Sequence, residues 1–258
     1  MKEYTEERRK AKERFASYVA NYDISDPKIS LKAVHTYKVA ELCEYIGSSL
    51  GLEGEELFVA WMCGLLHDIG RFEQVTRYNT FVDADSIDHA LLSTEILFGA
   101  GDRERGILHD FIELAEYDEI LYKAIRYHSA YRLPEELTER EKMYCHILRD
   151  ADKIDIFRVN LETPMEEIYN TTTEELYHSR VTPEVLQAFM EHHAVLRNLK
   201  KTPVDNVVGH LALFYELVFP KSRELAIEQG DLKKLSQFES RCPETREVFR
   251  QIRNELEI

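Results

Sequence analysis

The sequence predicts an all-α protein, a helical bundle followed by a C-terminal helical extension. Apolar residues recur with a period of about 3.6 residues, as in amphipathic helices, whereas the alternation typical of strands is nearly absent. Residues that favour helix starts precede these apolar segments along the whole chain. With 258 residues, 44% of them hydrophobic, the chain is expected to form a single all-helical domain over residues 1–258.

Six helices are expected before residue 161. They cover about residues 5–20, a segment that starts at residue 30, residues 55–67, a segment from 85 or 86 to 97, and residues 117–128 and 138–160. Ser30 is a favourable N-cap for the second of these helices. Gly70 follows the third helix as a favourable C-cap. Either Asp85 or Ser86 is expected to cap the fourth.

The C-terminal extension, about residues 160–258, is expected to be helical as well. Thr138 and Glu141 form a T-x-x-E capping box that opens the helix before it. Thr-Pro pairs then place a capping hydroxyl before a proline and predict helices at about 164–170, 183–199 and 203–218, with a last helix from 243 to the end. This extension is expected to act as a lid or as the surface of a homo-oligomer.

Composition restricts the partners and the location of the protein. The formal net charge is −15, so nucleic-acid polymers and anionic membranes are expected to be repelled. The longest apolar stretch, residues 57–66, is about half as long as a membrane span. The charged N-terminus lacks an export signal, and the four cysteines form no C-x-x-C pair, so we expect a cytoplasmic protein with reduced thiols.

The segment from Gly64 to Arg71 reads GLLHDIGR and carries the central motif. His67 and Asp68 adjoin the end of an apolar run. A titratable pair in a buried position costs several kcal/mol unless it is paired or bound to a metal. The pair is therefore a candidate for metal binding.

His35 and Asp152 are candidate partners of this pair. His35 lies on the apolar face of the second helix, and Asp152 lies in the segment DADKID of the long helix. The order His, His-Asp, Asp, together with the two local sequences, resembles the HD superfamily of metal-dependent phosphohydrolases. The resemblance covers about residues 30–157 and implies the helical bundle of an HD domain.

Two further histidines extend the resemblance to the two-metal branch of the superfamily. His89 falls in the first turn of its helix, and His128 ends another helix. The resulting pattern is His35, His67, Asp68, His89, His128 and Asp152. One-metal nucleotidases of the superfamily use only four of these residues, so the alternative is that His89 and His128 are surface residues.

The resemblance implies a dinuclear centre in which Asp68 bridges two metal ions. Imidazole and carboxylate ligands suit divalent transition metals; iron or manganese is expected, with zinc, nickel or cobalt as alternatives. A hydroxide that bridges the two metals would then attack a phosphate mono- or diester of a small metabolite or nucleotide. Asp68 is accordingly expected to be catalytic as well as a ligand.

Two cations next to the ligands are candidate catalytic residues that hold an anionic substrate. Arg71 follows the His-Asp pair and Lys153 follows Asp152. The alternative is that both are surface cations. An acidic loop that contains Asp83, Asp85 and Asp88 lacks the spacing of a calcium loop and is interpreted as capping and solvation.

Two other functions remain open. Some relatives with the same six ligands are mixed-valence diiron oxygenases, and the ligands alone do not separate the two chemistries. A non-catalytic sensor of a metabolite is the third hypothesis. The Gly-Tyr-Pro signature of the cyclic-dinucleotide branch is absent after His128, which argues against cyclic di-GMP as the substrate.

Overall fold

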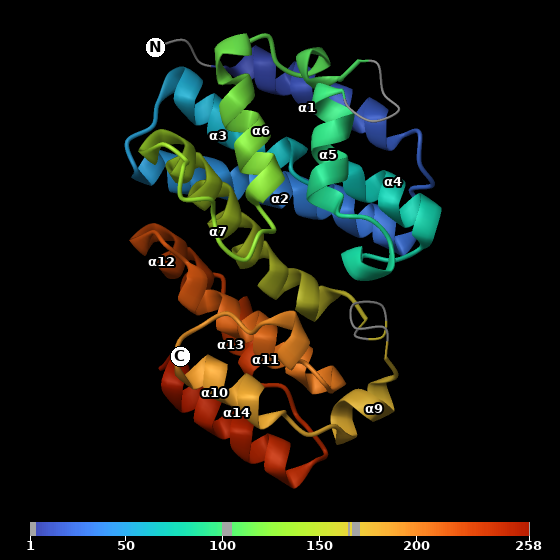
Figure 1. Ribbon diagram of the computed structural model, residues 1–258, viewed down its shortest axis with the longest axis vertical. Coiled ribbons are helices and arrows are strands. Elements are labelled where there is room, and N and C mark those ends of the chain that lie inside the picture. Colours follow the sequence, from blue (N-terminus) through green and yellow to red (C-terminus); the bar gives the residue numbers. More distant parts are fainter. Residues whose placement is uncertain (1–3, 100–104, 165, 167–170, 258) are drawn as a thin grey trace. The chain divides into compact units, whose positions relative to one another are not determined.

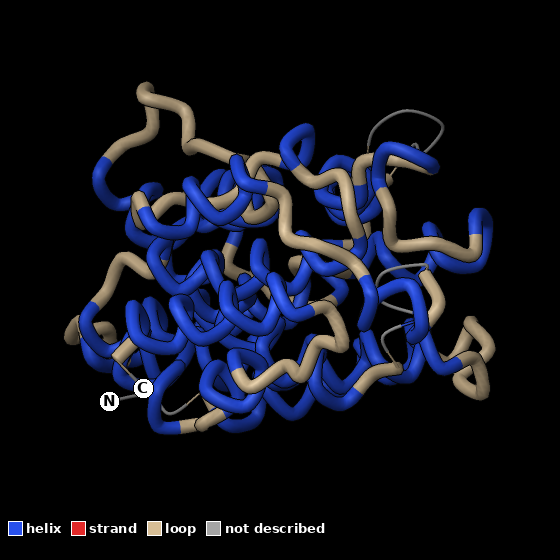
Figure 2. The backbone as a smooth tube through the Cα atoms, turned by 90° about the horizontal axis from the view of Figure 1, so that it is seen from below, coloured by secondary structure: helices blue, strands red, loops and turns tan. Residues whose placement is uncertain are grey.

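In a computed structural model, residues 4–99, 105–164, 166 and 171–257 are described. These residues form helices joined by loops, with no strand among them, which confirms the all-α prediction (Figure 2). The chain divides into two compact units, 1–152 and 153–258. The single domain expected from the sequence stays a prediction. Across the described residues, no helix combines the length and hydropathy that a membrane crossing needs.

The first unit consists of α1 to α6 and the first part of α7 (Figure 1). The helix α2 packs along α3 and also contacts α4, while α5 contacts both α4 and α6. The helix α3 contributes an unbroken run of buried residues from 58 to 66. The helices are α1 (Thr5–Val19), α2 (Pro27–Ser49), α3 (Gly54–Leu66), α4 (Ile69–Tyr78), α5 (His89–Phe98), α6 (Asp118–Tyr127) and α7 (Glu139–Glu162).

The expected N-cap of the second helix at Ser30 is wrong. The helix α2 begins at Pro27, and the carboxylate of Asp26 accepts a hydrogen bond of 2.8 Å from the backbone N–H of Lys28. Asp before Pro is itself a start signal, because proline at the first helical position has no N–H to satisfy. Ser30 therefore lies inside the first turn.

The expected C-cap at Gly70 is also wrong. The chain leaves α3 at Leu66 and starts α4 at Ile69, so Gly70 lies in a helix that was not anticipated. A Cβ atom at Gly70 would lie 2.7 Å from the backbone nitrogen of Ser93 and 2.9 Å from the carbonyl oxygen of His89. The glycine thus allows α4 to approach α5 closely.

The helix expected from Asp85 or Ser86 begins later. Asp83–Asp85 form a short 3-10 turn, and the N-cap of α5 is Asp88, whose carboxylate accepts a hydrogen bond of 2.9 Å from Leu91 N–H. The capping box of Thr138 and Glu141 is confirmed: each backbone N–H bonds to the other side chain.

The second unit contains α9 to α14, with α11 packed against α9, α10 and α13. The expected helix at 183–199 is too long, because α10 ends at Met190 and His192 adopts a positive φ of 59°. Most of the helix expected at 164–170 lies outside the described residues. The helices are α9 (Thr173–His178), α10 (Pro183–Met190), α11 (Pro203–Ala212), α12 (Pro220–Glu228), α13 (Asp231–Ser236) and α14 (Pro243–Leu256).

The helix expected at 203–218 is shorter than predicted, since α11 gives way to a 3-10 turn at Leu213–Glu216. The last helix starts at Pro243 as expected. The short helices α9, α12 and α13 were not anticipated. Helices of six to nine residues show too few turns for a clear apolar period.

Candidate metal centre

Six candidate ligands converge in the first unit, although five separate segments of the chain deliver them. Five of them are at most 4% exposed, and the side chain of the sixth, an aspartate, is 17% exposed. So many titratable groups in one buried place are costly unless they neutralise one another or bind a cation. The six are His35 in α2, His67 and Asp68 between α3 and α4, His89 at the start of α5, His128 after α6, and Asp152 in α7.

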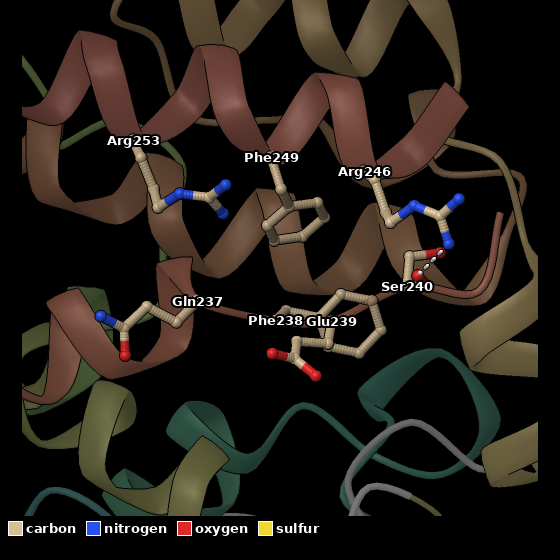
Figure 3. A pocket seen from close by; sticks show the side chains of 7 residues that line it. All are labelled: Gln237, Phe238, Glu239, Ser240, Arg246, Phe249 and Arg253. Carbon is tan, nitrogen blue, oxygen red and sulfur yellow. Dashed lines mark hydrogen bonds between the residues drawn. The ribbon is translucent and has the colours of Figure 1, made fainter. Parts of the chain in front are cut away.

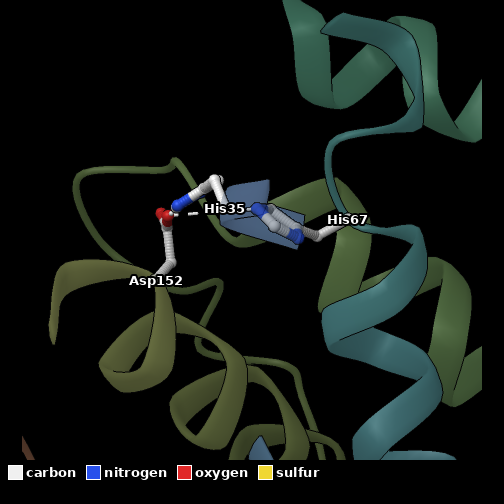
Figure 4. Close-up of side chains that lie close together, drawn as sticks. All are labelled: His35, His67 and Asp152. Atoms are coloured by element: carbon white, nitrogen blue, oxygen red, sulfur yellow. Dashed lines mark ion pairs between the residues drawn. The ribbon is translucent and has the colours of Figure 1, made fainter. Parts of the chain in front are cut away.

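His35, His67 and Asp152 form the first group of ligand atoms (Figure 4). Oδ1 of Asp152 lies 3.1 Å from Nε2 of His35 and 3.9 Å from Nε2 of His67. One atom from each residue falls within 4.8 Å of the others. Because metal bonds to these atoms are about 2.0–2.2 Å long, one ion fits among them.

His89 and His128 form the second group, and Asp68 lies between the two groups. Nε2 of His89 and Nε2 of His128 are 3.0 Å apart, and each lies 3.7 Å from Oδ1 of Asp68. The other carboxylate oxygen, Oδ2, lies 3.4 Å from Nε2 of His67 and 3.7 Å from Nε2 of His35. The two oxygens of one aspartate therefore face different sets of histidines.

The ring orientations of three histidines follow from hydrogen bonds at Nδ1. His67 meets the carbonyl of Gly64 at 2.8 Å, and His128 meets a carbonyl one turn earlier at 2.7 Å. His89 meets the carboxylate of Asp83 at 2.7 Å. Because these partners are acceptors, each Nδ1 carries the proton and donates it. In the neutral rings, Nε2 then presents a lone pair toward the cluster.

Such an arrangement fits a bound cation. Two neutral Nε2 atoms 3.0 Å apart, those of His89 and His128, would direct lone pairs at each other. Nε2 of His67 and Oδ1 of Asp68 are buried and have no hydrogen-bond partner among the described residues. A buried polar atom without a partner is costly. Metal ions would satisfy all four atoms, so the donor set suits divalent transition metals.

The electrostatics keep the two aspartates ionised and His89 neutral. Although burial opposes its charge, the ammonium of Lys32 holds the pKa of Asp68 well below its usual range. Burial likewise opposes ionisation of Asp152, but a hydrogen bond from His35 lowers the pKa of its carboxyl group. Burial lowers the pKa of His89 to about 4, so its ring is neutral at pH 7. The carboxylates are therefore anionic while this imidazole remains a free base.

Two residues beside the centre were missed by the sequence analysis. Nζ of Lys32 donates a hydrogen bond of 2.6 Å to Oδ2 of Asp68. Its position three residues before His35, on the same helix face, was the available signal. Asp83 was assigned to capping and solvation, which is wrong, because it holds His89 and also accepts a bond of 2.9 Å from Gln74. No sequence spacing marks that role.

Arg149 fixes the backbone around His128. Its Nη1 donates to the carbonyl oxygens of Tyr127 at 2.9 Å, of His128 at 3.2 Å and of Ala130 at 2.5 Å. These carbonyls lie at the end of α6 or just after it, where the regular N–H partners of a helix interior are missing. The guanidinium group thus anchors the turn that carries the ligand.

Arg71 lies beside the centre, with Nε 3.6 Å from Oδ1 of Asp68. Its Nη1 is held by the carbonyl of Phe81 at 2.8 Å and by Oδ1 of Asp83 at 3.1 Å. Lys153 is the residue after Asp152 in α7 and the first residue of the second unit. Substrate binding by Arg71 and Lys153 stays a prediction, as does metal binding by the six ligands.

The fold and this cluster define a class of protein, the helical enzymes with a buried histidine–aspartate cluster that could hold metal ions. Residues 33–157 match the HD domain. These residues therefore form an HD domain, the domain of a family of metal-dependent phosphohydrolases. No match to the chain was found among curated proteins or among solved structures.

Proposed function

We propose that the protein hydrolyses a phosphate mono- or diester of a small metabolite or nucleotide at a centre of two divalent transition-metal ions, iron or manganese. The HD domain supports hydrolysis of a phosphate ester as the reaction class. The substrate and the number of metal ions are the new parts of the proposal.

The position of Asp68 carries the two-metal proposal. Its Oδ2 faces His35 and His67 while its Oδ1 faces His89 and His128. A carboxylate can ligate two ions because its oxygens carry separate lone pairs. A one-metal centre would need only one of these oxygens and would leave the second histidine pair without a ligand role.

The chain prepares the site for an anionic ester in three ways. Neutral imidazoles and ionised aspartates hold the metals, and when bound, the metals supply Lewis acidity and lower the pKa of water. Arg71, 12% exposed at its side chain, places a fixed positive charge beside Asp68. Lys153, the residue after Asp152 in the sequence, supplies a second positive charge. In a chain of net charge −15, these local positive charges attract the phosphate.

Metal analysis and an ester panel test the proposal. Protein loaded with Mn²⁺ should contain two ions per chain and release phosphate, or a phosphomonoester, from at least one ester. The His89→Ala protein should keep one ion, whereas the Asp68→Asn protein should bind both ions more weakly. One ion per chain in the wild type, unchanged in the His89→Ala protein, would refute the second site.

Oxygen dependence separates hydrolysis from the oxygenase chemistry of other HD proteins. Ester cleavage should proceed at the same rate in anaerobic buffer, should stop with a chelator and should return with Mn²⁺. Turnover that needs both iron and dioxygen, without phosphate release, would replace the hydrolase with an oxygenase.

A further inference from the structure

The second unit contains a surface cavity of about 500 Å³ between α14 and the segment that follows α13 (Figure 3). Its volume falls in the range of small-molecule sites. None of its lining residues belongs to the unit that carries the candidate metal ligands. They are Gln237, Phe238, Glu239, Ser240, Arg246, Phe249 and Arg253.

One face of α14 supplies two arginines and the aromatic ring between them. Arg246, Phe249 and Arg253 follow one another at intervals of three and four residues, which places them on the same side of the helix (Figure 3). Seven residues of α-helix rise about 10 Å, so the two guanidinium groups start from backbone positions about 10 Å apart. The cavity thus has a positive charge toward each end.

Both arginines retain unused donors. Arg246 Nη1 makes only long bonds of 3.4 Å to the carbonyl oxygens of Ser240 and Arg241. Arg253 Nη1 donates to the carbonyl of Ser236 at 3.1 Å. Neither arginine pairs with a carboxylate in the part of the chain that the structure describes.

Other arginines of this unit do have carboxylate partners. The chain has 48 acidic and 33 basic residues, so acceptors for arginine are in excess. In the same unit, Arg180 pairs with Glu244 at 2.5 Å, Arg241 with Glu174 at 2.7 Å, and Arg250 with Glu247 at 2.5 Å. Two arginines that face one cavity and lack such partners are available to a ligand.

The aromatic rings between the arginines pack against one another. The ring centroids of Phe238 and Phe249 lie 5.1 Å apart, and Tyr177 stacks on Phe238 with centroids 5.3 Å apart. Phe249 is fully buried and Phe238 is 8% exposed. These packed rings leave little apolar surface to a ligand, so recognition depends on the two guanidinium groups.

We propose that this cavity binds a small organic dianion, a molecule with an anionic group, phosphate or carboxylate, toward each end. Each guanidinium group holds one anionic group through its unused N–H donors, since such bonds favour carboxylate and phosphate. Glu239 at the cavity opposes anions, and the amide of Gln237 offers hydrogen bonds to the polar edge of the ligand. The site is independent of the proposed hydrolysis.

Naphthalene-2,6-disulfonate serves as the probe, because it is a rigid planar dianion whose fluorescence reports binding. We expect saturable binding to the full chain at least about tenfold tighter than that of naphthalene-2-sulfonate, which has one anionic group. Inorganic sulfate, which is too short to reach both arginines, should compete only weakly.

Substitutions distinguish the cavity from other binding places. Arg246→Gln and Arg253→Gln should each weaken binding of the dianion about tenfold, with unchanged melting temperatures. Arg250→Gln, on the same helix but paired with Glu247, is the matched control and should change nothing. Glu239→Gln should strengthen binding about two- to threefold, because it removes a negative charge from the cavity.

The proposal is overturned if the disulfonate binds no tighter than the monosulfonate. It is also overturned if the two arginine variants bind the disulfonate as the Arg250→Gln control does. The Glu239→Gln variant tests the same site without changing either arginine. The proposal can therefore still be tested if an arginine variant fails to fold.

Discussion

The close approach of α2 and α3 depends on Gly64, and replacing this glycine by alanine tests whether that approach builds the metal centre. A Cβ atom at Gly64 would lie 2.5 Å from Cα of Ala40 and 2.7 Å from its nitrogen. Carbon atoms pack at about 3.5–4.0 Å, so the helices must separate by about 1 Å. Because α2 carries His35 and α3 leads directly into His67, the separation would pull two ligands apart.

The energetic cost follows from the same contact. Overpacking costs about 1–3 kcal/mol, and the upper end applies here because the obstacle is backbone. Alanine returns about 1 kcal/mol of helix propensity, so the net loss is about 2 kcal/mol. For a chain of this size, that lowers the melting temperature by about 4–8 °C. Affinity for Mn²⁺ should fall about tenfold, as it does when residues that support a ligand are lost.

Gly47→Ala is the matched control, since it adds the same atom to the same pair of helices. Its Cβ would meet side-chain atoms, the nearest being Cδ1 of Leu57 at 3.1 Å, and a side chain can move aside. Thermal melts with and without Mn²⁺, followed by metal titration, compare the two variants. If Gly64→Ala melts and binds metal like Gly47→Ala, the helix approach does not set the ligand positions and this reasoning fails.

Three further outcomes are expected. Asp83→Asn should lower the affinity for one metal ion about 10- to 100-fold, because Asp83 orients His89, whereas Asp85→Asn, in the same acidic turn but exposed, should not. Equal metal affinities in the two variants would show that Asp83 does not orient the ligand. Lys32→Met should lower the melting temperature of the metal-free protein, because the buried charge of Asp68 then lacks its ammonium partner. It should also increase the rise in melting temperature on adding Mn²⁺, and an unchanged rise would contradict this reasoning. Burial lowers the pKa of His210 to about 3, so the unfolded chain takes up a proton first as the pH falls below about 6.5. From pH 7 to pH 5, the free energy of unfolding from urea titrations should therefore fall by up to about 2 kcal/mol more in the wild type than in His210→Gln, and equal decreases would exclude the histidine.

Local signals predicted the elements that depend on neighbouring residues. The capping box at Thr138 and the proline at 243 located helix starts, because a cap is formed within one turn of chain. The start of α2 was misplaced by three residues, since Asp26 and Ser30 both resemble caps and only one is used. The helix α4 was missed because Gly70 was interpreted by its common role at helix ends, whereas it serves a contact with α5.

The sequence by itself determined the helical class and the identities of the candidate ligands, because apolar periodicity and motif order are written along the chain. Only the tertiary structure decided which atoms meet: that the two oxygens of Asp68 face separate histidine pairs, that Lys32 neutralises this aspartate, and that Asp83 orients His89. Apart from the contact between the adjacent residues His67 and Asp68, each of these contacts joins residues at least six positions apart on different elements. Side-chain distances of about 3 Å between such segments follow from helix packing, which no local pattern encodes.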